Sequence, residues 1–413
     1  MKFAHFADVH IGSWRDPKLS EASTQAFVKA ADICIEQAAD FILISGDFFN
    51  TSLPSIDCLK EVAKKLKQIH DSNVPVYVIA GSHDFSPTGK TMLDVLENAG
   101  LIRNVMRGNV QDNRLKLNFT TDRKTGTKIT GIIGKKGMLE RKYFETLEKE
   151  NLEAETGTKI FMFHTAISEF KPEGLESMES TPLSDFPKGF DYYAGGHVHH
   201  PYLKNAEGYG TIANPGPLFP NSFREIEKLG CGGFYMVQEE KGNLKAEFQP
   251  IQVHNTFSIT TDCTNKTPQE AEEELLKQTA DKEFNNTIIT IRLHGKLRTG
   301  KPTDIEFRKI SETLYKKSAH FVMKNTAALT SNEFEEIKIT TESIEETENL
   351  IIKEHLSKIK IDGMNTEAEF ELVKNLMAVL NKEKDEGETT TTFERRIKED
   401  AEKTLKIKAT SHN

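Results

Sequence analysis

Cysteine is scarce in this chain of 413 residues, and no two cysteines form a Cys-x-x-Cys pair. The four cysteines lie far apart, at Cys34, Cys58, Cys231 and Cys263. This usage excludes a disulfide-dense secreted domain and predicts reduced thiols in an intracellular protein. Long apolar runs are also absent, since no stretch approaches the roughly 18–20 continuous apolar residues of a membrane span. The first ten residues have no apolar core of a signal peptide, so we expect none.

Positive charge is in the minority, with 54 Lys and Arg against 63 Asp and Glu, a net charge of −9. This balance taken alone argues against a nucleic-acid partner. The charges are unevenly placed, however, because nine Lys or Arg stand against three acids between Asp112 and Lys142. Six more stand against two acids between Arg292 and Lys309. Local patches of this kind can bind phosphate on an acidic chain, although each alone is equally well explained as a solvated face.

The chain is too long for one ordinary domain, and its pattern divides into three parts. Residues 1–254 alternate near-continuous apolar strands with amphipathic helices, which predicts an α/β fold whose sheet is covered on both faces. One of these helices is expected over residues 20–39, with Ser20 as its N-cap. Residues 255–330 predict a smaller α/β domain of order β-α-β-α-β, and residues 331–413 predict an acidic, helical tail.

Residues able to bind a metal follow five of the strands expected in the first part. They are Asp8 and His10, Asp47, Ser82 with His83 and Asp84, His164, and His197 with His199. Side chains beyond the carboxyl ends of strands in an open α/β sheet converge at one edge. A single Asp of this kind is usually a cap or turn residue. A single His is usually a core or surface residue, and His5, His70, His200 and His254 are assigned to that class. Five strand ends together predict a metal site.

The residue types indicate which chemistry this site performs. Aspartate and imidazole without cysteine suit Mn²⁺, Fe or Zn²⁺ rather than a structural thiolate site. Two such ions can activate water and stabilise both the attacking and the leaving oxygen of a phosphoryl transfer. Asp47, on the central strand, is expected to bridge the two ions. His83 is the candidate proton donor to the leaving oxygen, and we hypothesise that Asp84 orients its ring.

The ordered motifs "ADVH", "SGD", "GSHD", "MFH" and "GGHVHH" resemble those of the calcineurin-like metallophosphoesterase superfamily over residues 1 to about 250. Within it, "MKFAHFADVHIG", "DFILISGDFFNTSLPS" and "YYAGGHVHHPY" resemble the meiotic-recombination-eleven (SbcD-like) nucleases that process DNA double-strand breaks. The resemblance implies a four-layer αββα sandwich and two Mn²⁺ ions per chain. It implies one ion held by Asp8, His10, Asp47 and His199, and a second held by Asp47, residue 82, His164 and His197.

Two positions depart from the pattern of that family. Ser82 stands where the family has asparagine, and a serine hydroxyl is a shorter and weaker oxygen ligand than an amide carbonyl. The second ion would then keep three strong protein ligands plus water, which is a workable catalytic site. Asn50 stands where some members carry a histidine that contacts the substrate phosphate, and it is assigned the same contact here.

The resemblance also implies roles for the rest of the chain. Residues 255–330 correspond to a DNA-binding capping domain, whose basic residues would contact phosphates without reading sequence. The tail resembles a segment that docks on an SMC-like coiled-coil ABC ATPase. One predicted tail helix, residues 366–383, carries an apolar stripe that is either core or partner surface: Phe370, Val373, Leu376, Met377 and Leu380. A homodimer through helices near residues 55–70 and 90–100 is implied as well.

The sequence therefore predicts a Mn²⁺-dependent DNA nuclease, acting as a 3′–5′ exonuclease and an endonuclease in repair by homologous recombination. It would be cytoplasmic, of prokaryotic type and associated with the nucleoid. One alternative is a small-molecule phosphodiesterase of the same superfamily, against which the extra domains and basic segments argue. The other is a DNA-end-binding scaffold whose catalysis is weakened by Ser82.

Overall fold

The computed structural model describes residues 1–86, 89–135, 137, 139–331, 352, 365–382 and 390–405. The chain forms two compact units, Met1–Phe334 and Glu335–Asn413. Within the described residues, no helix combines the length and the apolar character that crossing a membrane requires.

The first sheet of the first unit has six strands in the spatial order β14-β13-β1-β2-β3-β4. The strands are β1 (Lys2–Phe6), β2 (Phe41–Ser45), β3 (Val76–Ile79), β4 (Arg103–Asn104), β13 (Gly232–Glu240) and β14 (Asn243–Ile251). Strands β1 to β4 are parallel, whereas β13 and β14 run antiparallel at one side. The carboxyl ends of β1, β2 and β3 therefore lie at the same edge of the sheet.

The second sheet also has six strands, in the order β11-β12-β10-β9-β8-β7. The strands are β7 (Thr120–Thr121), β8 (Lys128–Ile132), β9 (Lys159–His164), β10 (Tyr192–Gly196), β11 (Tyr202–Asn205) and β12 (Thr211–Asn214). Strands β8, β9, β10 and β12 are parallel, so β9 and β10 also end at a common edge. A separate hairpin pairs β5 (Arg107–Gln111) with β6 (Arg114–Asn118).

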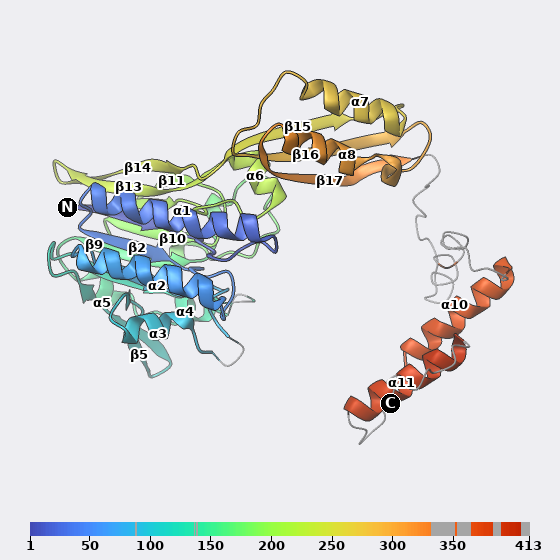
Figure 1. Ribbon diagram of the computed structural model, residues 1–413. Coiled ribbons are helices and arrows are strands. Elements are labelled where there is room, and N and C mark those ends of the chain that lie inside the picture. Colours follow the sequence, from blue (N-terminus) through green and yellow to red (C-terminus); the bar gives the residue numbers. More distant parts are fainter. Residues whose placement is uncertain are drawn as a thin grey trace. The chain divides into compact units, whose positions relative to one another are not determined.

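Helices cover the outer faces of the two sheets. They are α1 (Pro17–Glu36), α2 (Ile56–Asp71), α3 (Met92–Asn98), α4 (Arg141–Glu145) and α5 (Glu150–Glu153). A further helix, α6 (Phe223–Leu229), contacts strands near the end of the unit. Helices α1 and α2 lie side by side over the first sheet (Figure 1), where Ala26 and Val62 pack in one core with Ile42. A second core, with Tyr77 and Tyr192, fills the space between the sheets. The predicted αββα sandwich is confirmed.

Helix α1 begins earlier than the sequence pattern indicated. Its N-cap is Asp16, whose Oδ1 accepts a hydrogen bond from the backbone N of Lys18 at 2.9 Å. Pro17 follows at the first helical position, where its fixed φ suits the helix and its missing N–H costs nothing. The prediction of Ser20 as N-cap was wrong, because Ser20 lies inside the helix and the Asp-Pro pair provides the stronger start signal.

The last part of the first unit is a small three-stranded layer. Its elements are β15 (Asn255–Asp262), α7 (Pro268–Gln278), β16 (Thr287–Leu297), α8 (Phe307–Lys316) and β17 (Ala319–Ser331). The expected β-α-β-α-β order is confirmed, and the three strands are parallel in the order β15-β16-β17. Ile288 of β16 belongs to the core of the first sheet, and Phe321 and Met323 of β17 pack against it. This layer is called the capping region below.

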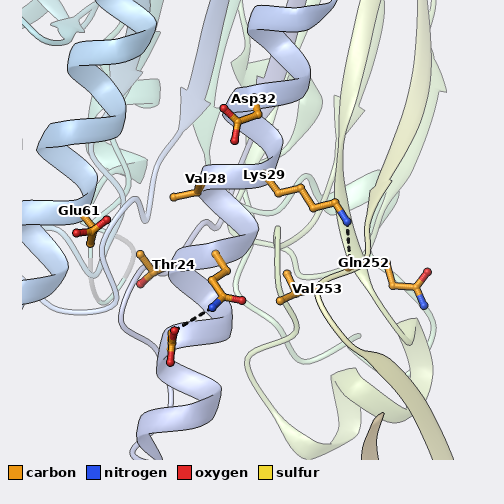
Figure 2. A pocket seen from close by; sticks show the side chains of 9 residues that line it. Thr24, Val28, Lys29, Asp32, Glu61, Gln252 and Val253 are labelled. Carbon is orange, nitrogen blue, oxygen red and sulfur yellow. Dashed lines mark hydrogen bonds between the residues drawn. The ribbon is translucent and has the colours of Figure 1, made fainter. Parts of the chain in front are cut away.

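The connection from β14 to the capping region is held against α1. Lys29 Nζ donates a hydrogen bond to the carbonyl of Gln252 at 2.8 Å (Figure 2). Beside this contact lies a surface hollow of about 540 Å³, lined by Glu21, Thr24, Gln25, Val28, Lys29, Asp32, Glu61, Gln252 and Val253. None of the residues that line it is a predicted metal ligand, so the metal site lies elsewhere.

In the second unit, α10 (Thr366–Leu380) contacts α11 (Thr390–Thr404). Lys382 Nζ lies 2.8 Å from Oδ2 of Asp400 and joins the two helices. These helices correspond to those expected at 366–383 and 393–408. The helix expected at 342–360 lies outside the described residues, apart from position 352.

Candidate metal centre

The predicted metal ligands of the first unit follow strands that end at the shared edge. Asp8 and His10 follow β1, Asp47 follows β2, His164 ends β9, and His197 and His199 follow β10. The backbone of four of them is left-handed, with φ of 47° at Asp8, 45° at His10, 49° at Asp47 and 86° at His197. Such φ values cost energy in residues with a Cβ and cluster at functional sites. The backbone is bent here to aim these side chains at one place.

Three groups of donor atoms each lie within 4.8 Å of one another. They are Asp8 with His10 and His199, His10 with Asp47 and His83, and Asp8 with Asp47 and His164. Because the groups share members, they form one continuous cluster, which we call the metal cluster. Its inner members are almost fully buried, at 0% exposure for Asp8, 2% for Asp47 and 1% for His164.

His164 tests whether this cluster fits a metal. Its Nδ1 donates to the carbonyl of Ser45 at 2.8 Å, which directs Nε2 into the cluster, 3.2 Å from Oδ2 of Asp47. Nε2 is buried without a hydrogen bond. Burial lowers the pKa of His164, but the charges of Asp47 and Asp8 outweigh it and raise that pKa to about 10. An imidazole nitrogen aimed at buried carboxylates is the arrangement of a metal ligand, and the donor set fits a divalent cation.

Glycine makes room for this ring and for Asp47. A Cβ on Gly46, whose φ is 83°, would lie 2.2 Å from Nδ1 of His164. A Cβ on Gly81 would lie 2.2 Å from the backbone N of Asp47. The strand ends therefore approach each other more closely than any other residue type permits.

Asp47 lies at the centre of the metal cluster. Its Oδ1 accepts a hydrogen bond from the backbone N of His83 at 2.8 Å, and its Oδ2 is 3.6 Å from Nε2 of His10. Burial raises the pKa of Asp47, but the neighbouring His164, His10 and His83 hold it well below its usual range. Asp47 is thus an anion that belongs to two of the three donor groups.

His10 and His199 face each other with their Nε2 atoms 3.1 Å apart. Two nitrogen ligands at about 2.0–2.1 Å from one cation, at right angles to each other, lie roughly 3 Å apart. Burial lowers the pKa of His10 to about 3, so this ring is neutral. Asp8 completes the group, with Oδ1 3.9 Å from Nε2 of His199.

Glu225 of α6 is a functional residue that sequence reasoning missed. Its Oε1 is 3.2 Å from Nδ1 of His199, on the side of the ring away from the metal cluster. A carboxylate in this place fixes the tautomer and the orientation of a ligating histidine. The available signal was "SFRE", a Ser-x-x-Glu capping motif, since Ser222 is the N-cap of α6 and accepts from the backbone N of Glu225.

Asp84 has a different role from the one hypothesised. Its carboxylate accepts hydrogen bonds from the backbone N of Gly81, Phe48 and Phe49, at 2.8, 3.3 and 3.0 Å. Burial, then the charge of Asp47, raises the pKa of Asp84 to about 7. Through these contacts Asp84 ties together the loops after β2 and β3. Its buried side chain does not orient the ring of the neighbouring His83.

The ring of His83 is oriented instead by Asn50. Nδ1 of His83 donates to the carbonyl of Asn50 at 2.9 Å, which leaves Nε2 for proton exchange. The ring is partly exposed and lies edge-on to His10, with centroids 4.9 Å apart. His83 therefore combines access to solvent with a fixed position within the metal cluster.

His197 and Ser82 lie next to the metal cluster without belonging to its three donor groups. The backbone N of His197 donates to both oxygens of Asp8, at 2.9 and 3.1 Å, and its ring centroid is 5.2 Å from that of His164. Burial lowers the pKa of His197 to about 4. Ser82 is half-buried between Gly81 and His83, both of which contact Asp47.

His5 was assigned to the core or the surface rather than to the metal site, and the structure places it in the core. It is fully buried and bridges the sheets, with Nδ1 3.0 Å from the hydroxyl of Tyr192 and Nε2 3.1 Å from Oγ of Ser45. Burial lowers the pKa of His5 to about 3. The ring is a neutral structural link beneath the metal cluster.

Comparison with known proteins defines the class of this chain. Residues 1–201 match the family model of calcineurin-like phosphoesterases. Together with the αββα sandwich and the donor groups, this match establishes a metallophosphoesterase fold and a metal-dependent phosphoesterase. The donor set is suited to two divalent cations.

The particular relatives are DNA repair proteins. The chain is 26% identical to the DNA double-strand break repair protein Mre11 of Archaeoglobus fulgidus, over 83% of this chain and 77% of the relative. It is 26% identical to that of Methanococcus maripaludis over 88% and 92%, and 30% identical to that of Sulfolobus acidocaldarius over 55% and 56%. The resemblance seen in the motifs thus extends well beyond the metal cluster.

Replacing the central carboxylate should remove both metal positions. Asp47→Ala is expected to lower the number of divalent cations bound per chain at both positions, because Asp47 contributes to two donor groups. Elemental analysis after dialysis measures the stoichiometry, and Asp32→Ala, which breaks an ion pair between α1 and α2, is the control. Two ions retained by Asp47→Ala would contradict the bridging position.

Proposed function

We propose that this protein is a Mn²⁺-dependent DNA nuclease, with 3′–5′ exonuclease and endonuclease activity, that processes double-strand break ends for homologous recombination. The carrying observation is the metal cluster at the edge of the sandwich. Similarity to DNA double-strand break repair proteins over most of both chains supports DNA as the substrate. The proposal includes two Mn²⁺ ions per chain and a cytoplasmic protein associated with the nucleoid.

The two ions are assigned to overlapping sets of ligands. Asp8, His10, Asp47 and His199 would hold the first, and Asp47, Ser82, His164 and His197 the second. When bound, the two cations would lower the pKa of a water nucleophile and neutralise phosphate charge. The buried Nε2 of His164, which faces Asp47, and the facing Nε2 atoms of His10 and His199 support these assignments.

His83 is proposed as the general acid that protonates the leaving sugar oxygen. The carbonyl of Asn50 holds Nδ1, so the transferable proton is on Nε2 of the partly exposed ring. Asp84 acts indirectly, by joining the loop that carries His83 to the loop after β2 that carries Asp47 and Asn50. The side chain of Asn50 is assigned to the substrate phosphate.

Contacts with DNA phosphates are assigned to a subset of the basic residues. Within the two basic segments, several cations pair with nearby acids: Lys116 with Glu148, Lys124 with Asp40, Lys128 with Glu155, Arg141 with Glu145, Arg292 with Glu227, Arg298 with Glu270 and Arg308 with Glu312. The exposed Arg114, Arg123, Lys142, Lys296 and Lys309 are the better candidates for phosphate contacts. The capping region at residues 255–330 is proposed to hold the duplex.

A homodimer is proposed through the surface near α2 and α3. Apolar side chains are exposed there, at 76% for Leu53, 84% for Ile56 and 56% for Val95. Exposed apolar side chains grouped on one surface commonly mark a protein interface. The tail helices α10 and α11 are proposed to bind an SMC-like ABC ATPase.

Turnover by His83→Ala tests the proposed function directly. On an end-labelled duplex with Mn²⁺, this variant should keep metal and DNA binding but cleave roughly 10²–10⁴-fold more slowly, the usual contribution of a general acid. His70→Ala, on α2, is the control. Parallel rates on bis-p-nitrophenyl phosphate and cyclic nucleotides test the small-molecule alternative, which preferential turnover of those substrates would support.

Ser82→Asn tests whether residue 82 faces the second ion. The longer amide carbonyl should replace a water ligand, and half-maximal activity should move to a lower Mn²⁺ concentration. One restored ligand is worth on the order of 5–150-fold in affinity. A melting curve checks that the pocket accepts the side chain. A folded Ser82→Asn variant with unchanged Mn²⁺ dependence would contradict the assignment of residue 82 to the second ion. An unmodified protein that binds DNA ends without cleaving them would favour the scaffold alternative.

Binding of the ATPase is assigned to the apolar stripe of α10. No residue of α10 is fully buried, and Leu380 is 58% exposed, so the stripe has surface left for a partner. Leu376→Glu should abolish co-purification with the ATPase while leaving cleavage of short duplexes unchanged. Asn375→Glu introduces the same charge on an exposed position of this helix and should have no effect. Equal recovery of the ATPase with both variants would refute the assignment.

A further inference from the structure

Helix α6 lies beside the capping region (Figure 1), and its Glu225 reaches His199 of the metal cluster. It is two turns long, from Phe223 to Leu229, and contacts both β15 and β16. Glu225 and Glu227 are two residues apart, and at 3.6 residues per turn their side chains leave the helix roughly 200° apart. Ile226, between them, is buried in the core of the first sheet. The helix thus directs Glu225 toward the metal cluster and Glu227 toward the capping region.

Toward the metal cluster, Glu225 fixes the ring of His199. The carboxylate is held by the start of its own helix, since Oε2 accepts from the backbone N of Asn221 at 2.8 Å and Oε1 from Oγ of Ser222 at 3.0 Å. Oε1 also lies 3.2 Å from Nδ1 of His199. A displacement of α6 would therefore carry the His199 ring with it.

On the side of α6 that faces the capping region, Arg292 of β16 binds Glu227. Its guanidinium makes a two-pronged pair with Glu227, at 2.6 Å from Nη2 and 3.0 Å from Nε. The same guanidinium lies over the ring of Phe223, 5.1 Å from the centroid. Phe223 and Glu227 are four residues apart, so Arg292 spans one full turn of the helix. A planar, two-pronged pair of this kind fixes direction as well as distance.

We propose that α6 couples the capping region to the metal centre, so that the ion pair between Arg292 and Glu227 sets the orientation of His199 through Glu225. Arg292, Glu227 and Glu225 are then positioning residues. A ligand that shifts the capping region changes the metal affinity of the His199 site. Metal binding in turn favours one position of the capping region against α6. The inference uses the metal centre of the proposed function, but it does not require that DNA be the substrate.

Mn²⁺ affinity, measured by calorimetry on the full chain, tests this coupling separately from DNA cleavage. Glu225→Ala should weaken binding of one ion about 10- to 100-fold, the usual effect of losing the partner of a ligating histidine. Arg292→Gln, which touches no ligand, should weaken the same ion roughly 2- to 30-fold. The reversed pair Arg292→Glu with Glu227→Arg should recover most of the loss.

Arg298→Gln is the matched control, because it removes a similar Arg–Glu pair, with Glu270, that lies within the capping region and does not reach α6. It should leave Mn²⁺ affinity unchanged. Unchanged affinity in Arg292→Gln, equal losses in Arg292→Gln and Arg298→Gln, or no recovery in a folded reversed pair would each overturn the coupling. Melting curves of each variant establish that it is folded. Loss of DNA cleavage with normal coupling would count against the proposed substrate alone.

Discussion

The burial of the Asp47 carboxylate among histidines is the interaction on which the rest of this structure depends. A buried anion is costly unless charge or hydrogen bonds compensate it, and here His164, His10 and His83 supply the compensation. To bring these groups together, strands from both sheets must end at one edge. The glycines at 46 and 81 and the left-handed backbone at Asp8, His10 and Asp47 are local consequences of that convergence.

Two further carboxylates support the metal cluster without belonging to its donor groups. Asp84 accepts three backbone N–H groups and fixes the loops that carry Asp47 and His83. Glu225 contacts Nδ1 of His199, on the side of the ring away from the metal cluster. Both depend on backbone donors, from the loop after β2 and from the start of α6, so the site is supported by the main chain as much as by side chains.

Basic residues in this protein serve internal structure more than the sequence suggests. Arg292 belongs to a segment whose charge predicts phosphate binding, yet its guanidinium pairs with Glu227 of α6. Lys124 and Lys128 likewise pair with Asp40 and Glu155. A run of like charges in sequence says little about a surface, because the fold brings acids from distant segments against it. The proposed phosphate-binding surface is therefore smaller than the basic segments.

The sequence by itself determined an α/β fold whose sheet is covered on both faces, the alternation of strands and helices, and the convergence of Asp8, His10, Asp47 and the three later histidines on one edge. Those features follow from apolar periodicity and from residue types at strand ends, which are local properties. Only the tertiary structure decided which groups orient the ligands. Asn50 rather than Asp84 holds His83, and Glu225 holds His199. These contacts join residues 33 and 26 positions apart in the chain. No local pattern encodes such a distance, which is set by how the loops and α6 pack.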